Sequence, residues 1–380
     1  MKIFDVAVIG SGPSGAMAAY HLAKNGISTV ILEKEVLPRY KTCGGGLVHR
    51  GKALIPFDIA KAIESEFEEV DMYIDKTNIQ LSTKREVPII SMVMRDTFDH
   101  LIIENAVAQG AVLLQHHKVL DLELNDTITI QTTEGAINAK FIIAADGALG
   151  PTAKLAGWDE TRTLVPALEY EVEVEEAVFE RLSERVRFDI DGIPMGYAWC
   201  FPKKKHLSIG VVSFDLSKKN LNLKTHYTNY LKTLGIEKVI TEDKHGFVIP
   251  VAPRTDTFAQ KNVFLTGDAA GLADPIVAEG LSNALVSGIF AAEALIESKL
   301  EPQLAAALYN EKLQKNLIPE VSTGVRLAKL FYGKPVMRNM LIKQFGQIFA
   351  EAMTDVFMGK RTYPTDIKGT LKRKFKKVFF

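Results

Sequence analysis

Apolar residues follow three different patterns along this chain, and each pattern predicts a different kind of structure. Short apolar runs are typical of strands buried on both faces of a parallel sheet. Alternation of apolar and polar residues is typical of strands that expose one face, and spacings of three and four residues are typical of amphipathic helices. The first pattern occurs at Ile3–Ile9, Thr29–Leu32, Lys140–Ala145 and Asn262–Thr266, the second dominates 163–257, and the third fills 301–357.

This distribution predicts an α/β protein with three parts. A parallel sheet with helices is built from 1–70, 92–162 and 258–300, and a mostly antiparallel sheet domain, 71–91 and 163–257, is inserted into it. A helical C-terminal region with a basic tail follows at 301–380.

Local patterns also predict individual elements. We expect a helix over Ala53–Glu66 and another that follows Met94, with Asp96 or Thr97 as its N-cap. The expected strands of the second domain are Met72–Ile74, Asn78–Leu81, Val87–Ile90, Glu169–Val174, Arg185–Ile190, Tyr197–Pro202, Leu207–Val212 and Phe247–Val251, with turns at Asp191-Gly192 and Lys203–Lys205. The expected C-terminal helices are Leu304–Leu317, Val321–Tyr332 and Met337–Phe357.

The first apolar run leads into a glycine-rich loop with the spacing GxGxxG. In Gly10-Ser11-Gly12-Pro13-Ser14-Gly15, the first glycine permits a tight turn and the second lets a pyrophosphate approach the backbone. The third lets the following helix pack closely on the strand, and the helix N-terminus offers free N–H groups to the phosphates. Glu33, with Lys34 beside it, ends the second strand and is placed to bind a ribose hydroxyl. A Rossmann-like dinucleotide site is predicted.

Two later strands end in residues that suit the same ligand. Asp146-Gly147 follows one apolar run and Gly267-Asp268 follows the other. A long helix begins at Gly280-Leu281 and presents a second positive N-terminus. Since ligands collect at the carboxyl ends of parallel strands, these residues favour a ligand larger than a mononucleotide.

Three further features could carry chemistry, and each has a simpler interpretation. Cys43 precedes three glycines, which marks either a backbone close to a ligand or a flexible loop. Arg95 is either a phosphate or adenosine contact or a surface charge. Tyr197, Trp199 and Phe201 share one face of a strand, either as core packing or as the wall of an apolar substrate pocket.

Composition narrows the setting. Lysine and arginine (46) balance aspartate and glutamate (46), so no general attraction to nucleic acid is expected. Two cysteines provide no disulfide framework, which favours a reducing compartment. The chain starts almost directly with a strand, and no run reaches the roughly 18–20 apolar residues that span a bilayer. We therefore expect a cytoplasmic protein, soluble or peripheral.

The last residues are basic and aromatic. From Lys360 onward, eight lysines and arginines face Asp366 alone, and Phe375, Phe379 and Phe380 lie among them. Such a terminus is either a solvated tail or a contact for anionic lipid headgroups, which attract a basic residue by about 1 kcal/mol near the surface. A peripheral membrane contact is therefore a hypothesis for this segment.

The glycine loop and the Asp146 and Asp268 strand ends, in this order, resemble the FAD-binding flavoproteins related to p-hydroxybenzoate hydroxylase. Within that superfamily, Lys41-x-Cys43-Gly44-Gly45 and Tyr197-x-Trp199-x-Phe201-Pro202 are similar to the geranylgeranyl reductase family. The resemblance covers roughly residues 3–300. It implies an FAD-dependent oxidoreductase that reduces C=C bonds of an isoprenoid chain, a hydrophobic small-molecule substrate.

The resemblance also implies roles for particular residues. Cys43 is expected near the flavin ring as the proton donor or a positioning group, and the Tyr197–Pro202 strand is expected to line the isoprenoid pocket. The expected cofactor-binding residues are Gly10, Gly12, Pro13, Ser14, Gly15, Glu33, Lys34, Cys43, Gly44, Gly45, Arg95, Asp146, Gly147, Gly267, Asp268, Gly280 and Leu281, the expected substrate-binding residues are Tyr197, Trp199, Phe201 and Pro202, and no metal site is expected.

Two departures from the family pattern leave alternatives open. Hydroxylases follow Asp-Gly with a serine and an arginine that helps to bind NADPH, whereas this chain has Gly150–Lys154, so the electron donor is NADPH or another reductant. Ala278 stands where the family often has glycine, which alters the backbone close to the flavin. The alternatives are a flavin monooxygenase or halogenase acting on an aromatic or polyketide substrate, and a non-catalytic, redox-responsive flavin-binding protein.

Overall fold

The computed structural model describes residues 2–74, 78–215, 221–255 and 257–364. Its first sheet has the strand order β17-β18-β11-β1-β2-β8, and β18, β11, β1, β2 and β8 pair in parallel. The antiparallel strands β9 and β10 extend it through β11. The bounds are β1 Ile3–Ile9, β2 Thr29–Leu32, β8 Val112–Leu114, β9 Val119–Glu123, β10 Ile128–Thr132, β11 Gly135–Ala144, β17 Ala259–Gln260 and β18 Val263–Leu265.

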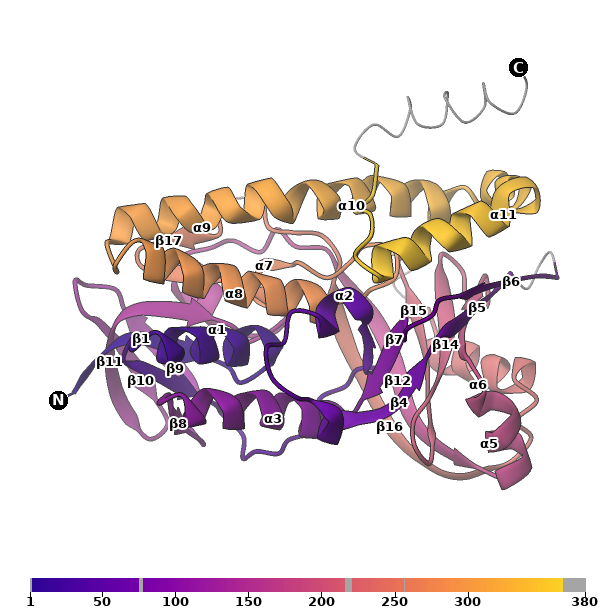
Figure 1. Cartoon of the computed structure of the whole chain (residues 1–380), viewed down its shortest axis with the longest axis horizontal. Coiled ribbons are helices and arrows are strands. Elements are labelled where there is room, and N and C mark those ends of the chain that lie inside the picture. Colours follow the sequence, from indigo (N-terminus) through magenta and orange to yellow (C-terminus); the bar gives the residue numbers. More distant parts are fainter. Residues whose placement is uncertain (1, 75–77, 216–220, 256, 365–380) are drawn as a thin grey trace, which may run out of the picture.

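Helix α1 (Pro13–Lys24) lies at the centre of the first domain. Ala16, Ala18 and Ala19 are fully buried, and these small side chains let α1 pack against both α3 (Arg95–Ala108) and α8 (Leu281–Glu297). The approach of α8 is especially close, because a Cβ at Gly288 would lie 2.1 Å from the carbonyl oxygen of Ser14. The glycine loop before α1 is therefore fixed by helices on two sides (Figure 1).

The second sheet has the order β16-β12-β15-β14-β13-β5-β6 and is antiparallel except for the parallel pair β13–β5. On β14, Tyr197, Trp199 and Phe201 join one buried cluster, while Ala198 and Cys200 join another beneath α6. The predicted division of this strand into two faces is confirmed. The bounds are β5 Glu69–Ile74, β6 Ile79–Lys84, β12 Leu164–Val174, α5 Glu176–Ser183, β13 Val186–Ile190, β14 Gly196–Pro202, β15 Leu207–Ser213, α6 Leu223–Thr233 and β16 Val239–Pro250.

A small sheet, β3-β7-β4, brings the Cys43 loop to the junction of the two larger sheets. The loop leads directly into β3, which pairs with β7. The bounds are β3 Gly46–Val48, β4 Ile63–Phe67 and β7 Ile90–Val93, and the short helices nearby are α2 His49–Lys52, a 3-10 turn at Ala60–Ala62, α4 Thr152–Leu155 and α7 Gly267–Ala270.

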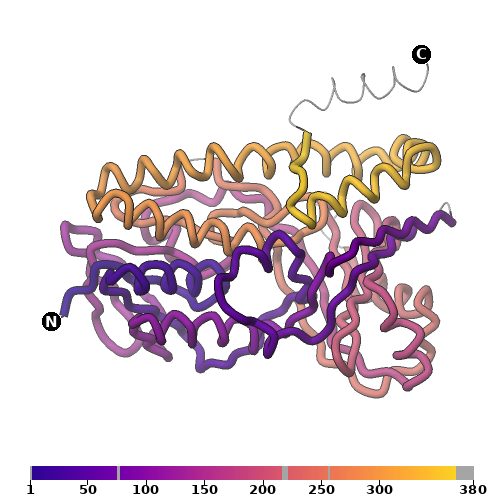
Figure 2. The backbone as a smooth tube through the Cα atoms, viewed as in Figure 1, coloured from indigo at the N-terminus to yellow at the C-terminus, as the bar shows by residue number. Residues whose placement is uncertain are grey.

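The C-terminal region consists of the predicted helices, α9 (Pro302–Asn316), α10 (Ile318–Gly333) and α11 (Pro335–Phe357). Figure 1 shows α9 and α10 beside α8 in a layer along the parallel sheet, with α11 turning back over the second sheet. There α11 packs against β6 and α2, so that segments from opposite ends of the sequence lie side by side (Figure 2). Most of the basic tail, 365–380, lies outside the described residues.

Four local expectations were wrong. Val87–Ile90 is not a strand of the second sheet: the strand here is β7, Ile90–Val93, and it pairs with β3 and β4 in the small sheet. Ala53–Glu66 is not a helix: β4 begins at Ile63 because pairing with β7 overrides the helical spacing. Helix α3 begins at Arg95, with Met94 as N-cap, because the Arg95 guanidinium pairs with Asp99 one turn later. The antiparallel sheet is also longer than expected, since β16 already begins at Val239 and pairs along the whole of β12.

Candidate functional site

A cavity of about 830 Å³ opens between the carboxyl edge of the parallel sheet and the second sheet. The ends of β1, β2, β11 and β18 border it on one side, and the aromatic face of β14 borders it on the other. Of the residues expected at the site, it is lined by Gly10, Gly12, Pro13, Ser14, Glu33, Lys34, Cys43, Gly44, Gly45, Arg95, Asp146, Gly147, Asp268, Gly280, Leu281, Tyr197, Trp199 and Phe201.

Gly15, Gly267 and Pro202 are not among the lining residues. A Cβ at Gly15 would lie 2.1 Å from the carbonyl oxygen of Gly10, so this glycine holds α1 against the loop from beneath. Gly267 packs against Ser14, and the Pro202 carbonyl accepts a hydrogen bond from the Ser65 hydroxyl at 2.6 Å. These three residues support the cavity from behind its wall.

The glycine loop leaves room for an anion at one position. Gly10 has φ +100°, and a Cβ there would lie 2.4 Å from the carbonyl oxygen of Ala145. In contrast, a Cβ at Gly12 would meet only the guanidinium nitrogens of Arg95 at 3.9 Å and Arg39 at 4.0 Å. The loop is therefore tightly packed at Gly10, where the backbone must turn. At Gly12 it leaves open space beside two cations, where a pyrophosphate would lie.

Glu33 is buried at the end of β2. Its Oε2 accepts the backbone N–H of Ser11 at 3.1 Å, and its Oε1 accepts the N–H of Glu35 at 3.0 Å. Burial opposes the charge, but the hydrogen bonds from Ser11 and the charge of Arg39 hold the pKa of Glu33 below its usual value. The carboxylate stays ionised, and Oε1 retains capacity to accept another hydrogen bond.

Arg95 is held by a bidentate ion pair. Its Nε and Nη2 donate to the two oxygens of Asp99 at 2.8 and 2.9 Å, and Arg39 contacts the same carboxylate at 3.2 Å. Burial opposes the Arg95 charge, but Asp99 outweighs it and raises the pKa. Arg95 therefore presents a fixed, permanent charge beside the phosphate loop and in contact with Cys43, and it is not a surface residue.

The two aspartates at the strand ends differ. The Asp146 Oδ2 accepts the backbone N–H of Thr152 at 2.9 Å, so this side chain turns back over Gly150 and holds the start of α4. Its Oδ1 is buried with no partner in the described structure. Burial raises the pKa of Asp268, and the attraction of Lys41 and Arg95 offsets this in part. Asp268 lies next to Gly280, at the N-terminus of α8.

A buried lysine holds the Cys43 loop. The Lys203 ammonium donates to the carbonyl oxygens of Gly44 at 2.7 Å and Val93 at 2.9 Å, and this side chain is only 2% exposed. Gly45 donates its N–H to the Cys43 sulfur at 3.4 Å. The lysine-rich sequence 203–205 predicted a surface turn, but the Lys203 side chain is buried. Only its position directly after Pro202, at the end of the aromatic strand, could have indicated this.

Trp199 packs directly against this loop at the wall of the cavity. A Cβ at Gly44 would lie 2.9 Å from the Trp199 indole nitrogen, and the ring lies over Gly210 of the neighbouring strand. The indole N–H has no partner in the described structure, and the Tyr197 hydroxyl donates to the Val277 carbonyl. Tyr197, Trp199 and Phe201 therefore pack in the core and also form the cavity wall, so the two interpretations of the sequence are compatible.

Glu169, which was not predicted from the sequence, forms a polar patch at one end of this wall. Its carboxylate accepts hydroxyl hydrogen bonds from Tyr40 at 2.9 Å and Ser208 at 2.8 Å. Burial, together with the charge of Glu171, raises the pKa of Glu169 to about 8. Lys41 lies nearby over the Phe247 ring, at 3.7 Å from its centre, and burial lowers the pKa of Lys41. The cavity thus carries ionisable groups at one end of an otherwise apolar wall.

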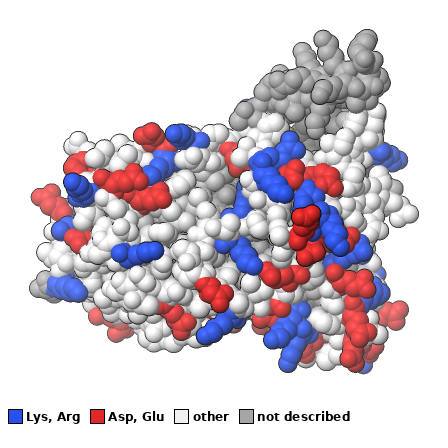
Figure 3. Space-filling view, viewed as in Figure 1, with Lys and Arg blue, Asp and Glu red and all other residues white. Residues whose placement is uncertain are grey.

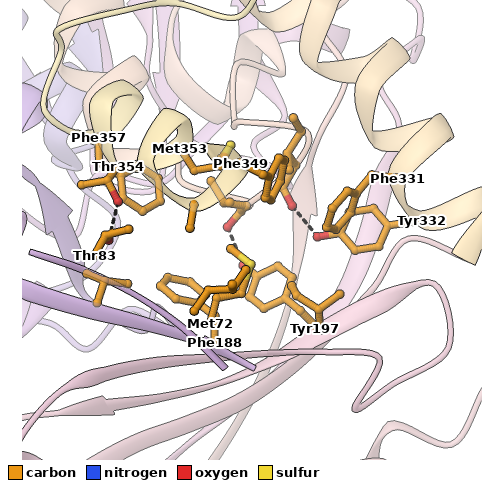
Figure 4. A pocket seen from close by; sticks show the side chains of 16 residues that line it. Met72, Thr83, Phe188, Tyr197, Phe331, Tyr332, Phe349, Met353, Thr354 and Phe357 are labelled. Carbon is orange, nitrogen blue, oxygen red and sulfur yellow. Dashed lines mark hydrogen bonds between the residues drawn. The ribbon is translucent and has the colours of Figure 1, made fainter. Parts of the chain in front are cut away.

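A smaller apolar pocket of about 40 Å³ continues from the cavity beneath α10 and α11. Phe188, Tyr197, Val277 and Phe357 line both spaces. Figure 4 shows Phe331 and Tyr332 of α10 and Phe349, Met353 and Phe357 of α11 closing over the sheet. The Tyr332 hydroxyl donates to the Ile276 carbonyl at 2.7 Å. The volume is close to that of one water molecule, so aromatic rings nearly fill this pocket.

The open glycine position, the ionised Glu33, the half-buried Asp268 and two helix N-termini fit a flavin dinucleotide. The chain matches the family described as FAD binding domain over residues 4–301. The protein is therefore an FAD-dependent oxidoreductase, in which residues of the glycine loop are suited to the pyrophosphate and Glu33 to a ribose hydroxyl.

Relatives define the group more closely. The chain is 30% identical to geranylgeranyl diphosphate reductase of Arabidopsis thaliana, covering 94% of this chain and 81% of that one. It is 29% identical to digeranylgeranylglycerophospholipid reductase 1 of Methanopyrus kandleri (80% and 83% covered). It belongs to the geranylgeranyl reductase family, within the superfamily of p-hydroxybenzoate hydroxylase.

Solved structures show the same fold. A geranylgeranyl bacteriochlorophyll reductase-like protein from Thermoplasma acidophilum superimposes with a TM-score of 0.76 at 24% identity, covering 87% of each chain. A flavin-dependent brominase has a TM-score of 0.76 at 18% identity, covering 99% of this chain and 100% of that one. The fold alone therefore does not separate a reductase from a halogenase.

Proposed function

We propose that this protein reduces C=C bonds in an isoprenoid chain, with FAD as the hydride donor. The observation that carries the proposal is that the Cys43 loop packs directly against the Trp199 wall, and that both line the cavity that the cofactor residues border. The relatives named above act on geranylgeranyl substrates, according to their names. An apolar wall of this kind suits a hydrocarbon chain and excludes water from it.

The chain's own residues would position the alkene and supply the proton. Reduced FAD, when bound, supplies a hydride to one alkene carbon. Cys43 donates its thiol proton to the other carbon, and the thiolate then takes a proton from solvent, so that the alkene gains one H₂ in total. An isolated alkene accepts hydride poorly, so positioning against Tyr197 and Trp199 must provide much of the rate. Arg95, in contact with Cys43, would stabilise the transient thiolate.

The test is an anaerobic turnover. The protein is reconstituted with FAD, reduced with dithionite and mixed with geranylgeranyl diphosphate or a geranylgeranyl phospholipid. Flavin reoxidation without oxygen, together with a product that has gained one H₂ per reduced bond, is the expected result. Flavin that stays reduced until air is admitted would contradict the reductase and favour the monooxygenase or halogenase. Dithionite avoids the choice of physiological reductant, NADPH or another donor.

Two cysteine variants test the proton donor. Cys43→Ser should keep the flavin spectrum and lose at least about tenfold in the rate of alkene reduction, in line with general acid contributions. Cys200→Ser is the matched control, because Cys200 lies on the other face of β14, away from the cavity. Equal rates for Cys43→Ser and the wild type would remove Cys43 from the mechanism and leave the reductase assignment intact.

A further inference from the structure

The turn from α10 into α11 presents apolar side chains to solvent. Val336 is 76% exposed and Met340 is 68% exposed, and the five consecutive residues 333–337 are all exposed. We call residues 329–348 the hairpin tip. Figure 1 shows it at one end of the molecule, and the surface there is largely white in the space-filling view (Figure 3). Five exposed large apolar side chains fall within this segment, Leu330, Val336, Met337, Met340 and Ile348, and apolar side chains that gather on one surface mark an interaction site.

A buried ion pair fixes the hairpin tip to the body of the protein. Arg338, one turn into α11, is 4% exposed and pairs with Asp191 at the end of β13. Its guanidinium also lies 5.1 Å from the centre of the Phe331 ring on α10. The tip is therefore held rigidly in place with its apolar side chains outward.

The charge of this region has one sign. Residues 321–350 contain five lysines and arginines and no aspartate or glutamate. Asp191 neutralises Arg338, whereas no ion pair within the described residues holds Lys329, Lys334 or Lys343. An anionic bilayer has an apolar interior beneath negatively charged headgroups. The exposed apolar side chains suit its interior, and the neighbouring lysines suit its headgroups.

The hairpin tip also adjoins the apolar pocket that leads to the cavity. Leu330 and Ile348 are 37% and 54% exposed, and their sequence neighbours Phe331 and Phe349 line that pocket, where their rings stack 5.3 Å apart. Figure 4 shows these rings over the sheet. A membrane surface at the tip would therefore lie next to this apolar pocket.

We propose that the hairpin tip docks on the surface of an anionic lipid bilayer, inserting Val336 and Met340 among the acyl chains while Lys334 and Lys343 contact headgroups. No helix within the described ranges is long and apolar enough to cross a bilayer. The docking is therefore interfacial. The docking proposal rests on this surface alone and does not depend on the proposed isoprenoid substrate.

The experiment measures cosedimentation of the full-length chain with vesicles, in an equal mixture of phosphatidylcholine and phosphatidylglycerol and in phosphatidylcholine alone. Binding to the anionic vesicles should exceed binding to the neutral ones and weaken with salt. The double variant Val336→Asp/Met340→Asp should lower the partition coefficient at least about tenfold, because charged side chains cannot enter the acyl region. Lys334→Gln and Lys343→Gln should each lower it about fivefold at low salt.

A matched control carries the same new charges elsewhere. Leu120 on β9 and Ile240 on β16 are 53% and 55% exposed, and Leu120→Asp/Ile240→Asp should bind vesicles as the wild type does. Equal binding by the wild type and by Val336→Asp/Met340→Asp would overturn the proposal. Vesicle binding that is lost when the C-terminal basic tail is removed, but not in the Val336→Asp/Met340→Asp variant, would also overturn it. A wild-type dimer in sedimentation velocity that the Val336→Asp/Met340→Asp variant dissociates would assign the tip to a second copy of the chain instead. Failure of vesicle binding leaves the anaerobic turnover unaffected, so the two proposals fail separately.

Discussion

Replacement of Gly45 by alanine probes the loop on which the proposed chemistry depends. Gly45 has φ +71°, and a Cβ there would lie 2.0 Å from the carbonyl oxygen of Val93 and 2.2 Å from the Lys203 ammonium nitrogen. The Val93 carbonyl belongs to β7 and cannot move alone, because Val93 also donates its N–H to the Gly45 carbonyl at 2.9 Å. Gly45→Ala must therefore displace the loop that carries Cys43.

The expected loss has two parts that a second glycine separates. Gly26 has φ +75° and no heavy atom within 4 Å of the position that a Cβ would take, so Gly26→Ala isolates the cost of a left-handed backbone, about 1–2 kcal/mol. Gly45→Ala adds an overlap worth about 1–3 kcal/mol. Unfolding entropy near 2 cal/mol/K per residue gives about 0.8 kcal/mol/K for 380 residues. The melting temperature should fall by about 1–3 °C for Gly26→Ala and by about 3–6 °C for Gly45→Ala.

The assay combines differential scanning fluorimetry with titration of FAD into the apoprotein. Gly26→Ala should bind FAD as the wild type does, because Gly26 lies in the turn after α1, away from the cavity. Gly45→Ala should bind FAD more weakly and reduce alkenes more slowly. Equal melting temperatures for the two variants would refute the close approach at Gly45, and unchanged FAD affinity in Gly45→Ala would separate the loop from the cofactor.

Two further predictions concern buried charges. Burial and then Glu171 raise the pKa of Glu169 to about 8, so the folded protein keeps a proton that the unfolded chain loses above about pH 4.3. As the pH rises from about 5 to about 8, the melting temperature of the wild type should therefore fall relative to that of Glu169→Gln. A difference in melting temperature that stays constant over this range would contradict the raised pKa of Glu169. Asp191→Asn leaves the Arg338 charge buried without its partner, which typically costs about 3–5 kcal/mol. Since asparagine tolerates the positive φ of residue 191, the melting temperature should fall by about 4–6 °C from the lost charge alone, and a loss below about 1 °C would show that Arg338 is solvated.

The features that could be predicted from sequence are those that depend on short-range geometry. The glycine loop follows from backbone sterics within six residues, which explains why Gly10, Gly12 and Gly15 have the expected positions. The two faces of β14 follow from the alternation of a single strand, and the C-terminal helices follow from their own periodicity. The buried strands of the parallel sheet follow in the same way from their short apolar runs.

Tertiary structure alone decided which polar groups are buried and what they contact. Lys203 has the sequence surroundings of a surface turn, yet it is buried because carbonyl oxygens of Gly44 and Val93, distant in sequence, accept its hydrogen bonds. Asp146 and Asp268 follow equivalent strands, but only Asp146 turns back to a helix start. Val336 and Met340 have the apolar character of core residues and instead face solvent. A side chain's spacing determines the face it occupies, whereas its surroundings depend on which distant segment packs against that face.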